Sequence, residues 1–444
     1  MEIGKRYRVT IEDLGEGGEG VAKVGGLTVF VPGVVLDDEV EMEITELKKN
    51  YAIGQVIAVT EPSPHRVISP CPDYPECGGC QLLDTSYQAQ LVWKERHVSE
   101  VLKRIGGLDL TVEPIIGMDE PYHFRNKMSY PVKQTELGLY QRNTHDIVEI
   151  QDCQIHPPIA GEVLDVIRQH LGKTIQGYNE LHHKGGLRQV MIRYGKDLDQ
   201  LMVVLVTCDK TNLRPLVEDL KAFPNIRTII ENKNCRAGNH ILGDKNIILY
   251  GDGVIEEVLG PDRFAIDTHS FYQVNTEQLK KLYNLVREFA NCQGHELVYD
   301  IYAGMGTIGT YLSRDCRKVV SIEVVPQAIE AGQQAALRND VENIEFIRGK
   351  AEDVMGTLNK QGLKPDLVIV DPPRKGLDDR LIDSLMEVKP QRIIYVSCKP
   401  STLARDLRRL VEGGYQVQRV RPVDMFPHTT HVETVCLLTR ISSM

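Results

Sequence analysis

The sequence lacks any long hydrophobic run, since none of its 444 residues falls in an uninterrupted apolar stretch of the roughly 18 residues that a membrane-spanning helix needs. Residues 1–8 are polar and carry both signs of charge. These absences argue against a membrane span and a secretory signal, so we expect a cytoplasmic protein with no membrane partner. Its 10 cysteines are then not expected to form a disulfide framework, because the cytosol keeps thiols reduced. Some of them should be ligands or catalysts.

An excess of basic residues is also missing, because the formal net charge is −10. Net charge is only weak evidence against a nucleic-acid partner, since phosphate groups are bound by local clusters of cations. Basic clusters occur at residues 125–127, 374–375 and 405–409, although such clusters are more often solvated faces. There is neither an internal repeat nor a low-complexity tract, and the length suits two or three domains.

Residues 1–60 consist of short alternating runs separated by glycine and proline turns. Five short strands with tight turns predict an OB-like β-barrel, a common platform for single-stranded nucleic acid. The segment resembles a TRAM domain, an RNA-binding barrel, most visibly at Val29-Phe30-Val31-Pro32-Gly33. A purely structural β-module is the alternative.

Three cysteines, Cys71, Cys77 and Cys80, lie close together in a loop rich in proline and glycine, and Cys153 follows further along the chain. Four thiolates suit zinc or an iron–sulfur cluster. The spacing differs from paired C-x-x-C zinc knuckles, so we favour the cluster over zinc. His156 competes with Cys153 as the fourth ligand, and unliganded cysteines remain the simplest alternative.

The chain after the barrel divides into two further parts. Residues 61–265 predict a central α+β domain that begins with the cysteine loop and a helix over 86–105, with strands at 128–133, 137–141, 187–194, 201–207 and 226–232 and helices at 158–171 and 211–222. Residues 266–444 alternate strands and helices. That alternation predicts a Rossmann-like, doubly wound α/β domain.

A glycine-rich turn follows the first strand of the carboxy-terminal domain. Gly304, Gly306 and Gly309 form a G-x-G-x-x-G pattern between a strand and a helix, and Glu323 ends the next strand. Glycines let a ligand approach the backbone, and an acid at that distance can bind ribose hydroxyls. The pattern predicts a nucleoside cofactor, either a dinucleotide or S-adenosylmethionine.

A thiol and two carboxylates are expected at the same edge of this sheet. Cys398 ends the apolar run 393–397, Asp371 follows the strand 367–370, and Glu433 precedes the last strand. A buried, inert cysteine is the alternative for Cys398. A thiolate that adds to carbon 6 of uracil makes carbon 5 nucleophilic enough to take a methyl group, and a general base then removes the hydrogen from carbon 5. Cys398 and Glu433 are the candidates for these two steps.

These features resemble the RNA (uracil-5-)-methyltransferase family over nearly the whole chain. The motifs that carry the resemblance are Phe271-Tyr272-Gln273-Val274-Asn275, Asp300-Ile301-Tyr302-Ala303-Gly304, Glu323, Asp371-Pro372-Pro373-Arg374, Val396-Ser397-Cys398 and His431-Val432-Glu433, together with the barrel and the cysteine loop. The resemblance implies that Cys398 is the nucleophile and Glu433 the proton acceptor. Met305 departs from the family by standing at a commonly polar position.

The resemblance also implies the cofactors. S-adenosylmethionine would be contacted by Gln273, Tyr302, Glu323, Asp371 and, more loosely, Asp353, while a [4Fe-4S] cluster would be held by Cys71, Cys77, Cys80 and Cys153. It further implies that the helix over 86–105 packs against the catalytic domain.

Family members that join all three parts act on 23S rRNA, whereas we expect tRNA members to match only the catalytic half. We therefore favour methylation of uridine in 23S rRNA by a monomer that binds no DNA, with tRNA as the alternative. A nicotinamide-dependent oxidoreductase would share the glycine turn but gives no role to the pair Cys398 and Glu433. A non-catalytic iron–sulfur RNA-binding protein would leave both residues unused.

Overall fold

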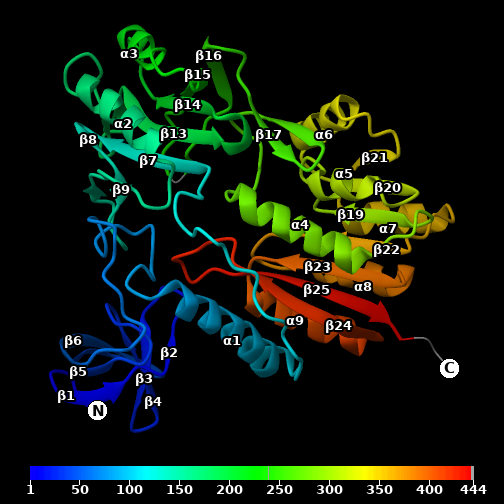
Figure 1. Ribbon diagram of the computed structural model, residues 1–444, viewed down its shortest axis with the longest axis horizontal. Helices are drawn as coiled ribbons and strands as arrows, with labels where there is room; N and C mark the ends of the chain where they lie inside the picture. The colour runs from blue at the N-terminus through cyan, green and yellow to red at the C-terminus, as the bar shows by residue number, and fades with distance from the viewer. Residues whose placement is uncertain (239, 442–444) are drawn as a thin grey trace.

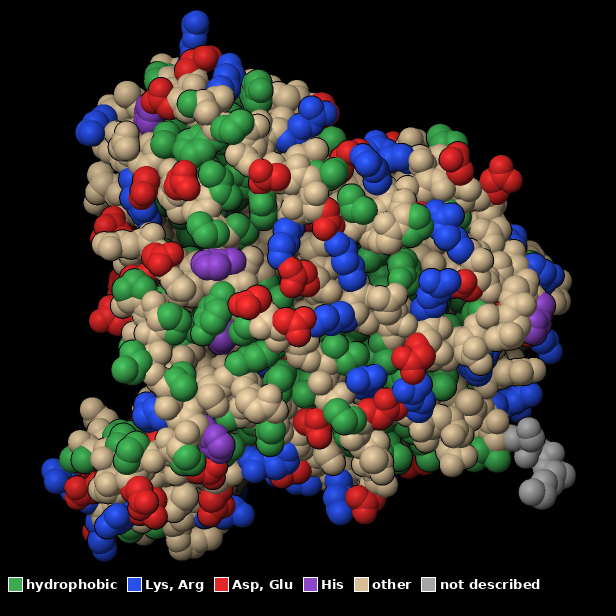
Figure 2. Space-filling model, viewed as in Figure 1, with side chains coloured by type: hydrophobic (Ala, Val, Ile, Leu, Met, Phe, Trp, Pro, Cys, Tyr) green, Lys and Arg blue, Asp and Glu red, His purple; other side chains and the backbone are tan. Residues whose placement is uncertain are grey.

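The computed structural model describes residues 1–238 and 240–441. Figure 1 shows a small β-domain at the amino terminus, a mixed domain above it, and a large α/β domain that ends at the carboxy terminus. Lysine and arginine side chains are interspersed with aspartate and glutamate over the face in Figure 2. Within the described residues, no helix combines the length and the apolar character needed to cross a membrane.

The amino-terminal domain is one six-stranded sheet in the order β1-β5-β6-β4-β3-β2. Alternate side chains of β5, including Val40, Met42 and Ile44, are fully buried, as expected for strands that curl around a core. The predicted five strands are joined by a short sixth, β2. The strands are β1 (Arg6–Thr10), β2 (Asp13–Leu14), β3 (Gly20–Val24), β4 (Leu27–Val31), β5 (Glu39–Leu47) and β6 (Tyr51–Glu61).

Helix α1 (Tyr87–Gly106) connects the barrel to the carboxy-terminal domain. Trp93, on the barrel side of the helix, packs into the barrel core, and its indole nitrogen donates to Asp13 Oδ1 at 2.9 Å. Val98 and Leu102 pack in the core of the carboxy-terminal domain, where α1 lies against α9 (Pro400–Glu412). The helix therefore belongs to the carboxy-terminal domain in space, although it precedes the central domain in sequence.

The central domain is built on a six-stranded sheet in the order β16-β15-β14-β13-β7-β8. Helices α2 (Pro158–His170) and α3 (Arg214–Leu220) cover one face. Part of the opposite face packs on the carboxy-terminal domain through Met191, Met202 and Val204. The strands are β7 (Lys127–Lys133), β8 (Glu136–Leu137), β13 (Leu187–Gly195), β14 (Gln200–Thr207), β15 (Ile226–Lys233) and β16 (Lys245–Tyr250), and a 3-10 turn, η1 (Lys196–Leu198), joins β13 to β14.

Three details of this domain differ from the sequence prediction. The single strand expected at 137–141 is divided at Gly138 into β8 and β9 (Leu139–Tyr140). The Val148 carbonyl oxygen lies 1.8 Å from where a Cβ of residue 138 would stand, so only glycine fits at this point. The helix expected at 211–222 is shorter. The strand β16 and the hairpin of β17 (Ile255–Leu259) and β18 (Asp262–Ile266) were not predicted. Two small hairpins complete the domain, β9 with β10 (Ile147–Val148) and β11 (Tyr178–Asn179) with β12 (Lys184–Gly185).

The carboxy-terminal domain confirms the doubly wound prediction. Its seven-stranded sheet has the order β21-β20-β19-β22-β23-β25-β24. The first five of these strands are parallel, while β25 is antiparallel to both of its neighbours. The strands are β19 (Leu297–Ile301), β20 (Lys318–Glu323), β21 (Ile344–Arg348), β22 (Leu367–Val370), β23 (Arg392–Ser397), β24 (Tyr415–Val423) and β25 (Glu433–Arg440).

Helices cover both faces of that sheet and create two separate apolar cores. The core on one face contains α4, α5 and α6, and the core on the other contains α1, α7, α8 and α9. The helices not yet given are α4 (Thr276–Ala290), α5 (Thr307–Ser313), α6 (Pro326–Arg338), α7 (Ala351–Lys360) and α8 (Asp379–Val388). With both faces covered, the carboxyl edge of the parallel strands is where a ligand can reach the sheet.

Candidate active site

The sheet topology brings four of the predicted site residues to one edge. Tyr302, Glu323, Asp371 and Cys398 stand at or immediately after the carboxyl ends of β19, β20, β22 and β23. Glu433 begins the antiparallel strand β25 next to β23, where Ser397 pairs with Thr434. The fold therefore places Glu433 beside the strand end that carries Cys398.

The glycine turn after β19 is shaped by backbone conformations that favour glycine. Gly304 and Gly306 have φ values of 55° and 69°. At Gly309, a Cβ would lie 2.8 Å from Asp300 Oδ2, which accepts a hydrogen bond from the Gly309 amide at 3.0 Å. Burial raises the pKa of the Asp300 carboxyl to about 7. Asp300 therefore holds the glycine turn in place through its hydrogen bond with the Gly309 amide.

Glu323 joins the glycine turn to the start of α6. Its Oε2 accepts from the Gly304 amide at 2.9 Å, while its Oε1 accepts from the amides of Val324 and Val325 at 2.7 and 2.9 Å. The carboxylate is thus held at the mouth of the turn. A carboxylate in this position matches the ribose-binding acid of nucleoside-binding folds.

The other two predicted cofactor residues lie on different elements. Gln273 precedes α4, and Asn126 of the central domain binds its carbonyl oxygen with a side-chain nitrogen at 3.0 Å. Asp353 lies in the first turn of α7, is mostly exposed, and forms an ion pair with Arg380 at 2.6 Å. The structure therefore directs Asp353 toward Arg380.

Cys398 and Glu433 are electrostatically coupled. Burial, followed by the negative charges of Glu433 and Asp371, raises the pKa of the half-buried Cys398 thiol to about 11. Glu433 is 3% exposed, and its burial raises the pKa of its carboxyl to about 8. Burial, followed by the negative charge of Asp300, raises the pKa of the Asp371 carboxyl to about 7. Perturbed groups of this kind, gathered at a ligand-binding edge of a sheet, are typical of catalytic sites.

Arg374 is a site residue that the sequence prediction passed over. Its guanidinium lowers the pKa of both Cys398 and Glu433, opposing the larger effect of burial. It also lies 3.4 Å from His431 Nε2. The signal was present in the motif Asp371-Pro372-Pro373-Arg374, which carries the family resemblance but from which no role for Arg374 was predicted.

The segment that leads to Glu433 is anchored by a buried ion pair from α1. The side chains of Lys94 and Asp424 are both 0% exposed, and Lys94 Nζ lies 2.5 Å from Asp424 Oδ1. Lys94 also donates to the Phe426 carbonyl at 3.0 Å, and the Tyr87 hydroxyl donates to Asp424 Oδ2 at 2.8 Å. A buried charge of either sign would be costly alone, so the pair fixes this segment against α1.

The same segment is bound by the end of the cysteine loop. The His428 carbonyl accepts from the amides of Gln81 and Leu82 at 2.9 and 3.0 Å. Gln90 of α1 accepts from the His428 amide at 2.9 Å and lies 3.2 Å from His428 Nδ1. The cysteine loop and the segment before Glu433 are therefore joined directly, five residues from the carboxylate.

The four predicted ligand cysteines line a single cavity. Cys71, Cys77, Cys80 and Cys153 surround it together with apolar side chains such as Met128 and Ile155. Burial raises the pKa of all four thiols. His156 is not among the residues that line the cavity, and its Nδ1 lies 2.7 Å from the Tyr130 hydroxyl. Of the two residues left open for the fourth position, the cavity therefore contains the cysteine.

The sulfur atoms of the cavity are spread apart. Among the described residues, the only three ligand atoms within 4.8 Å of one another belong to Cys208, Asp209 and Cys235. No three of the cavity sulfurs are therefore that close to one another.

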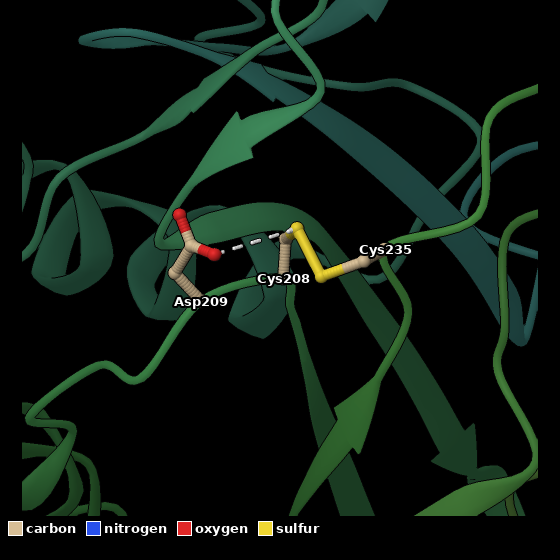
Figure 3. A group of neighbouring side chains, drawn as sticks. All are labelled: Cys208, Asp209 and Cys235. Carbon is tan, nitrogen blue, oxygen red and sulfur yellow. Dashed lines mark hydrogen bonds between the residues drawn. A yellow bond between two sulfur atoms is a disulfide. The ribbon is translucent and has the colours of Figure 1, made fainter.

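Cys208 and Cys235 form a disulfide, 27 residues apart in the sequence, at the ends of β14 and β15 (Figure 3). The prediction that no disulfide framework exists missed this single bond, because neither cysteine lies in a recognisable motif. Bonded sulfur atoms offer no thiolate, so the group with Asp209 is not a candidate metal centre.

Comparisons with known proteins agree with this geometry. Residues 244–441 match the family model described as tRNA (Uracil-5-)-methyltransferase, and residues 1–57 match the TRAM domain. An uncharacterized RNA methyltransferase of Halalkalibacterium halodurans is 44% identical, with 97% of this chain and 96% of that protein covered. A second one, from Staphylococcus aureus strain MRSA252, is 41% identical, with 96% of each covered.

A solved structure matches along almost the whole chain. It is the Pyrococcus abyssi tRNA (uracil-54, C5)-methyltransferase in complex with S-adenosyl-L-homocysteine, with a TM-score of 0.80, 30% identity, and coverage of 98% of this chain and 100% of that one. The expectation that tRNA members match only the catalytic half is therefore wrong for this relative. From its fold, its strand-end residues and these relatives, the chain belongs to the family of S-adenosylmethionine-dependent RNA (uracil-5-)-methyltransferases and carries an amino-terminal TRAM domain.

Proposed function

We propose that this protein transfers a methyl group from S-adenosylmethionine to carbon 5 of uridine in 23S rRNA. The observation that carries the reaction is the placement of the Cys398 thiol and the Glu433 carboxyl near Asp371 and Arg374, on neighbouring strands at the same sheet edge as the glycine turn. Carbon 5 of uracil is a weak nucleophile. A thiolate that adds to carbon 6 overcomes this by making an enolate.

Cys398 first loses its proton to solvent, and the resulting thiolate forms a bond to carbon 6 of the uracil ring, whose carbon 5 to carbon 6 electron pair moves toward carbon 5 and the carbon 4 oxygen as an enolate. Arg374 favours the thiolate, because its positive charge lowers the pKa of Cys398 against the effect of burial. The bound S-adenosylmethionine supplies the electrophilic methyl group that carbon 5 takes. Glu433 then accepts the hydrogen of carbon 5 as a proton, the electron pair forms the carbon 5 to carbon 6 double bond, and the sulfur leaves carbon 6.

The raised pKa of Glu433 suits this last step. A carboxylate whose conjugate acid has a pKa of about 8 is a stronger base than an ordinary glutamate. Its burial also keeps bulk water away from the proton being transferred. Cys398 and Glu433 thus take the two roles that the reaction requires.

The cofactor contacts that we propose follow the sheet edge. Glu323 would bind the ribose hydroxyls, while Gln273, Tyr302 and Asp371 would hold the rest of the cofactor. Asp353 would contact the adenine after exchanging its ion pair with Arg380.

The cysteine cavity would hold a [4Fe-4S] cluster on Cys71, Cys77, Cys80 and Cys153. Four cysteine ligands leave no iron site open, so the cluster would stabilise the loop and not react with the substrate. The hydrogen bonds from this loop to His428 support that role.

Two RNAs are candidates for the substrate. We propose 23S rRNA first, on the resemblance to members that join barrel, cysteine loop and catalytic domain. Transfer RNA is the second candidate, because the P. abyssi tRNA enzyme covers the same length of chain. The uridine should be unpaired, since the reaction needs a base that is out of its stack.

The test uses cluster-loaded protein with labelled S-adenosylmethionine and unmodified transcripts of each RNA. We expect label at carbon 5 of uridine with wild type and none with Cys398→Ala. RNA that contains 5-fluorouridine should trap a covalent adduct on Cys398, because the fluorine cannot leave as a proton. Transfer to tRNA alone would select the second substrate, and no transfer to any RNA would overturn the function.

A further inference from the structure

A cavity of about 440 Å³ on the central domain has no role in the reaction proposed above. Its walls come from β7, β13 and the two small hairpins β9–β10 and β11–β12. Leu139 of β9 separates it from the cysteine cavity, because this side chain lines both. The two cavities are therefore neighbours with different linings, one sulfur-rich and one aromatic and basic.

The floor of the cavity is the face of the central sheet opposite α2. Ser129 and Lys133 alternate along β7 with Met128 and Tyr130, which are buried under the helices. Lys127 lies on the same face, opposite Arg193, whose guanidinium donates to the Thr268 carbonyl at 3.5 Å. Since each residue of a strand advances about 3.4 Å, the floor begins about 7 Å from Lys127. It thus leads toward the segment that carries Gln273.

The walls carry one exposed aromatic ring, Tyr140, and one buried ring, Tyr178, which is covered by Arg188. Tyr140 is 42% exposed, and its ring lies 5.2 Å from that of His145. The guanidinium of Arg188 lies 5.0 Å from the Tyr178 ring centre. Arg188 is held there by the carbonyl oxygens of Arg236 and Gly238 at 2.7 and 2.9 Å. A guanidinium held in advance costs little entropy when a planar ligand stacks on it.

We propose that this cavity binds an unpaired nucleotide of the RNA substrate, separate from the uridine that is methylated. The base would stack between the exposed Tyr140 ring and the guanidinium of Arg188, and its phosphate would be near Lys133, which forms a long, exposed ion pair with Asp146 at 3.7 Å. Stacking on aromatic rings combined with a nearby cation is how single strands are bound without sequence readout. The proposal rests on the proposed function only in naming the RNA as a methylation substrate.

The experiment compares Tyr140→Leu with wild type. Affinity is measured by fluorescence anisotropy with a labelled single-stranded RNA of mixed sequence and about 20 nucleotides, long enough to span a typical site. We expect the Kd to rise about tenfold, which corresponds to the loss of one stacked base. Tyr140→Phe keeps the ring and should restore wild-type affinity. In methylation assays, KM for RNA should rise by a similar factor while kcat and the affinity for S-adenosyl-L-homocysteine stay within twofold.

Tyr250→Leu is the matched control. Tyr250 is 40% exposed, close to the 42% of Tyr140, and has a lysine, Lys221, near its ring. It lies on β16, at the edge of the six-stranded central sheet far from β7. Wild-type affinity in Tyr140→Leu, or an equal loss in Tyr250→Leu, would overturn the proposal. Because anisotropy needs no methyl transfer, an inactive wild type that still shows the Tyr140 effect would overturn the proposed function and leave the cavity assignment standing.

Discussion

Replacing Lys94 with methionine is expected to be among the most disruptive single changes in the chain. Both charges of the pair with Asp424 are fully buried and their atoms are 2.5 Å apart. Lys94→Met keeps the length of the side chain but leaves the Asp424 carboxylate with the Tyr87 hydroxyl as its remaining side-chain partner. Removing one member of a buried pair costs about 3–5 kcal/mol, because the other charge stays buried without compensation.

The loss should also reach the reaction. Lys94 binds the Phe426 carbonyl in the segment that ends at Glu433, so we expect kcat to fall more than tenfold while S-adenosyl-L-homocysteine binds normally. The free energy of unfolding is measured in urea, and hydrogen exchange is followed at residues 424–432. Lys103→Met on the exposed side of the same helix is the control and should change stability by less than about 0.5 kcal/mol.

A double variant isolates the charge effect from simple loss of packing. In Lys94→Met with Asp424→Asn no charge remains to be buried, so most of the lost stability should return. If the single variant costs less than about 1 kcal/mol, or if the double variant is worse than either single one, the ion pair does not hold this segment.

Three further outcomes follow from the same structure. The kcat/KM should rise between pH 6.5 and 9 as the Glu433 carboxyl, with its pKa of about 8, loses its proton, and Arg374→Met should move the midpoint to higher pH because the guanidinium lowers the pKa of Glu433 and Cys398. Glu433→Gln should melt at a higher temperature than wild type at pH 9 but not at pH 4. The raised pKa of the Glu433 carboxyl contributes to the free energy of unfolding of wild type. This contribution is complete below pH 4.5, the ordinary pKa of a glutamate, and is lost once the pH passes about 8, with an upper bound of about 5 kcal/mol. Iron content and visible absorbance should drop in Cys80→Ala and persist in Cys316→Ala, a cysteine buried to a similar extent elsewhere.

The regular parts of this fold could be predicted because their signals are local. The alternation of apolar and polar side chains predicted the barrel strands, and the alternation of strands and helices predicted the doubly wound domain with its glycine turn. Parallel strands share one carboxyl edge, so the approach of Tyr302, Glu323, Asp371 and Cys398 to one another could be predicted from their positions at strand ends.

The contacts between distant parts of the chain could not be predicted from the sequence. Lys94 and Asp424 are 330 residues apart, and each is by itself an ordinary charged residue in a polar sequence. The need for glycine at residue 138 depends on the Val148 carbonyl of β10, and the bond between Cys208 and Cys235 depends on β14 and β15 being adjacent. Pairing of this kind is decided by the packed structure, which propensities of short segments do not encode.

The position of α1 in the structure determines when this helix can pack during synthesis of the chain. Its apolar side, with Val98 and Leu102, packs on α9, and Lys94 meets a partner made 330 residues later. At about 5–20 residues per second, a ribosome needs roughly 15–65 s to make that stretch. Throughout this interval the helix carries a hydrophobic surface and an unpaired cation with nothing to cover them. We expect a nascent chain that has finished α1 but not α9 to bind chaperones strongly, and a fragment that starts at residue 266 to be insoluble for the complementary reason.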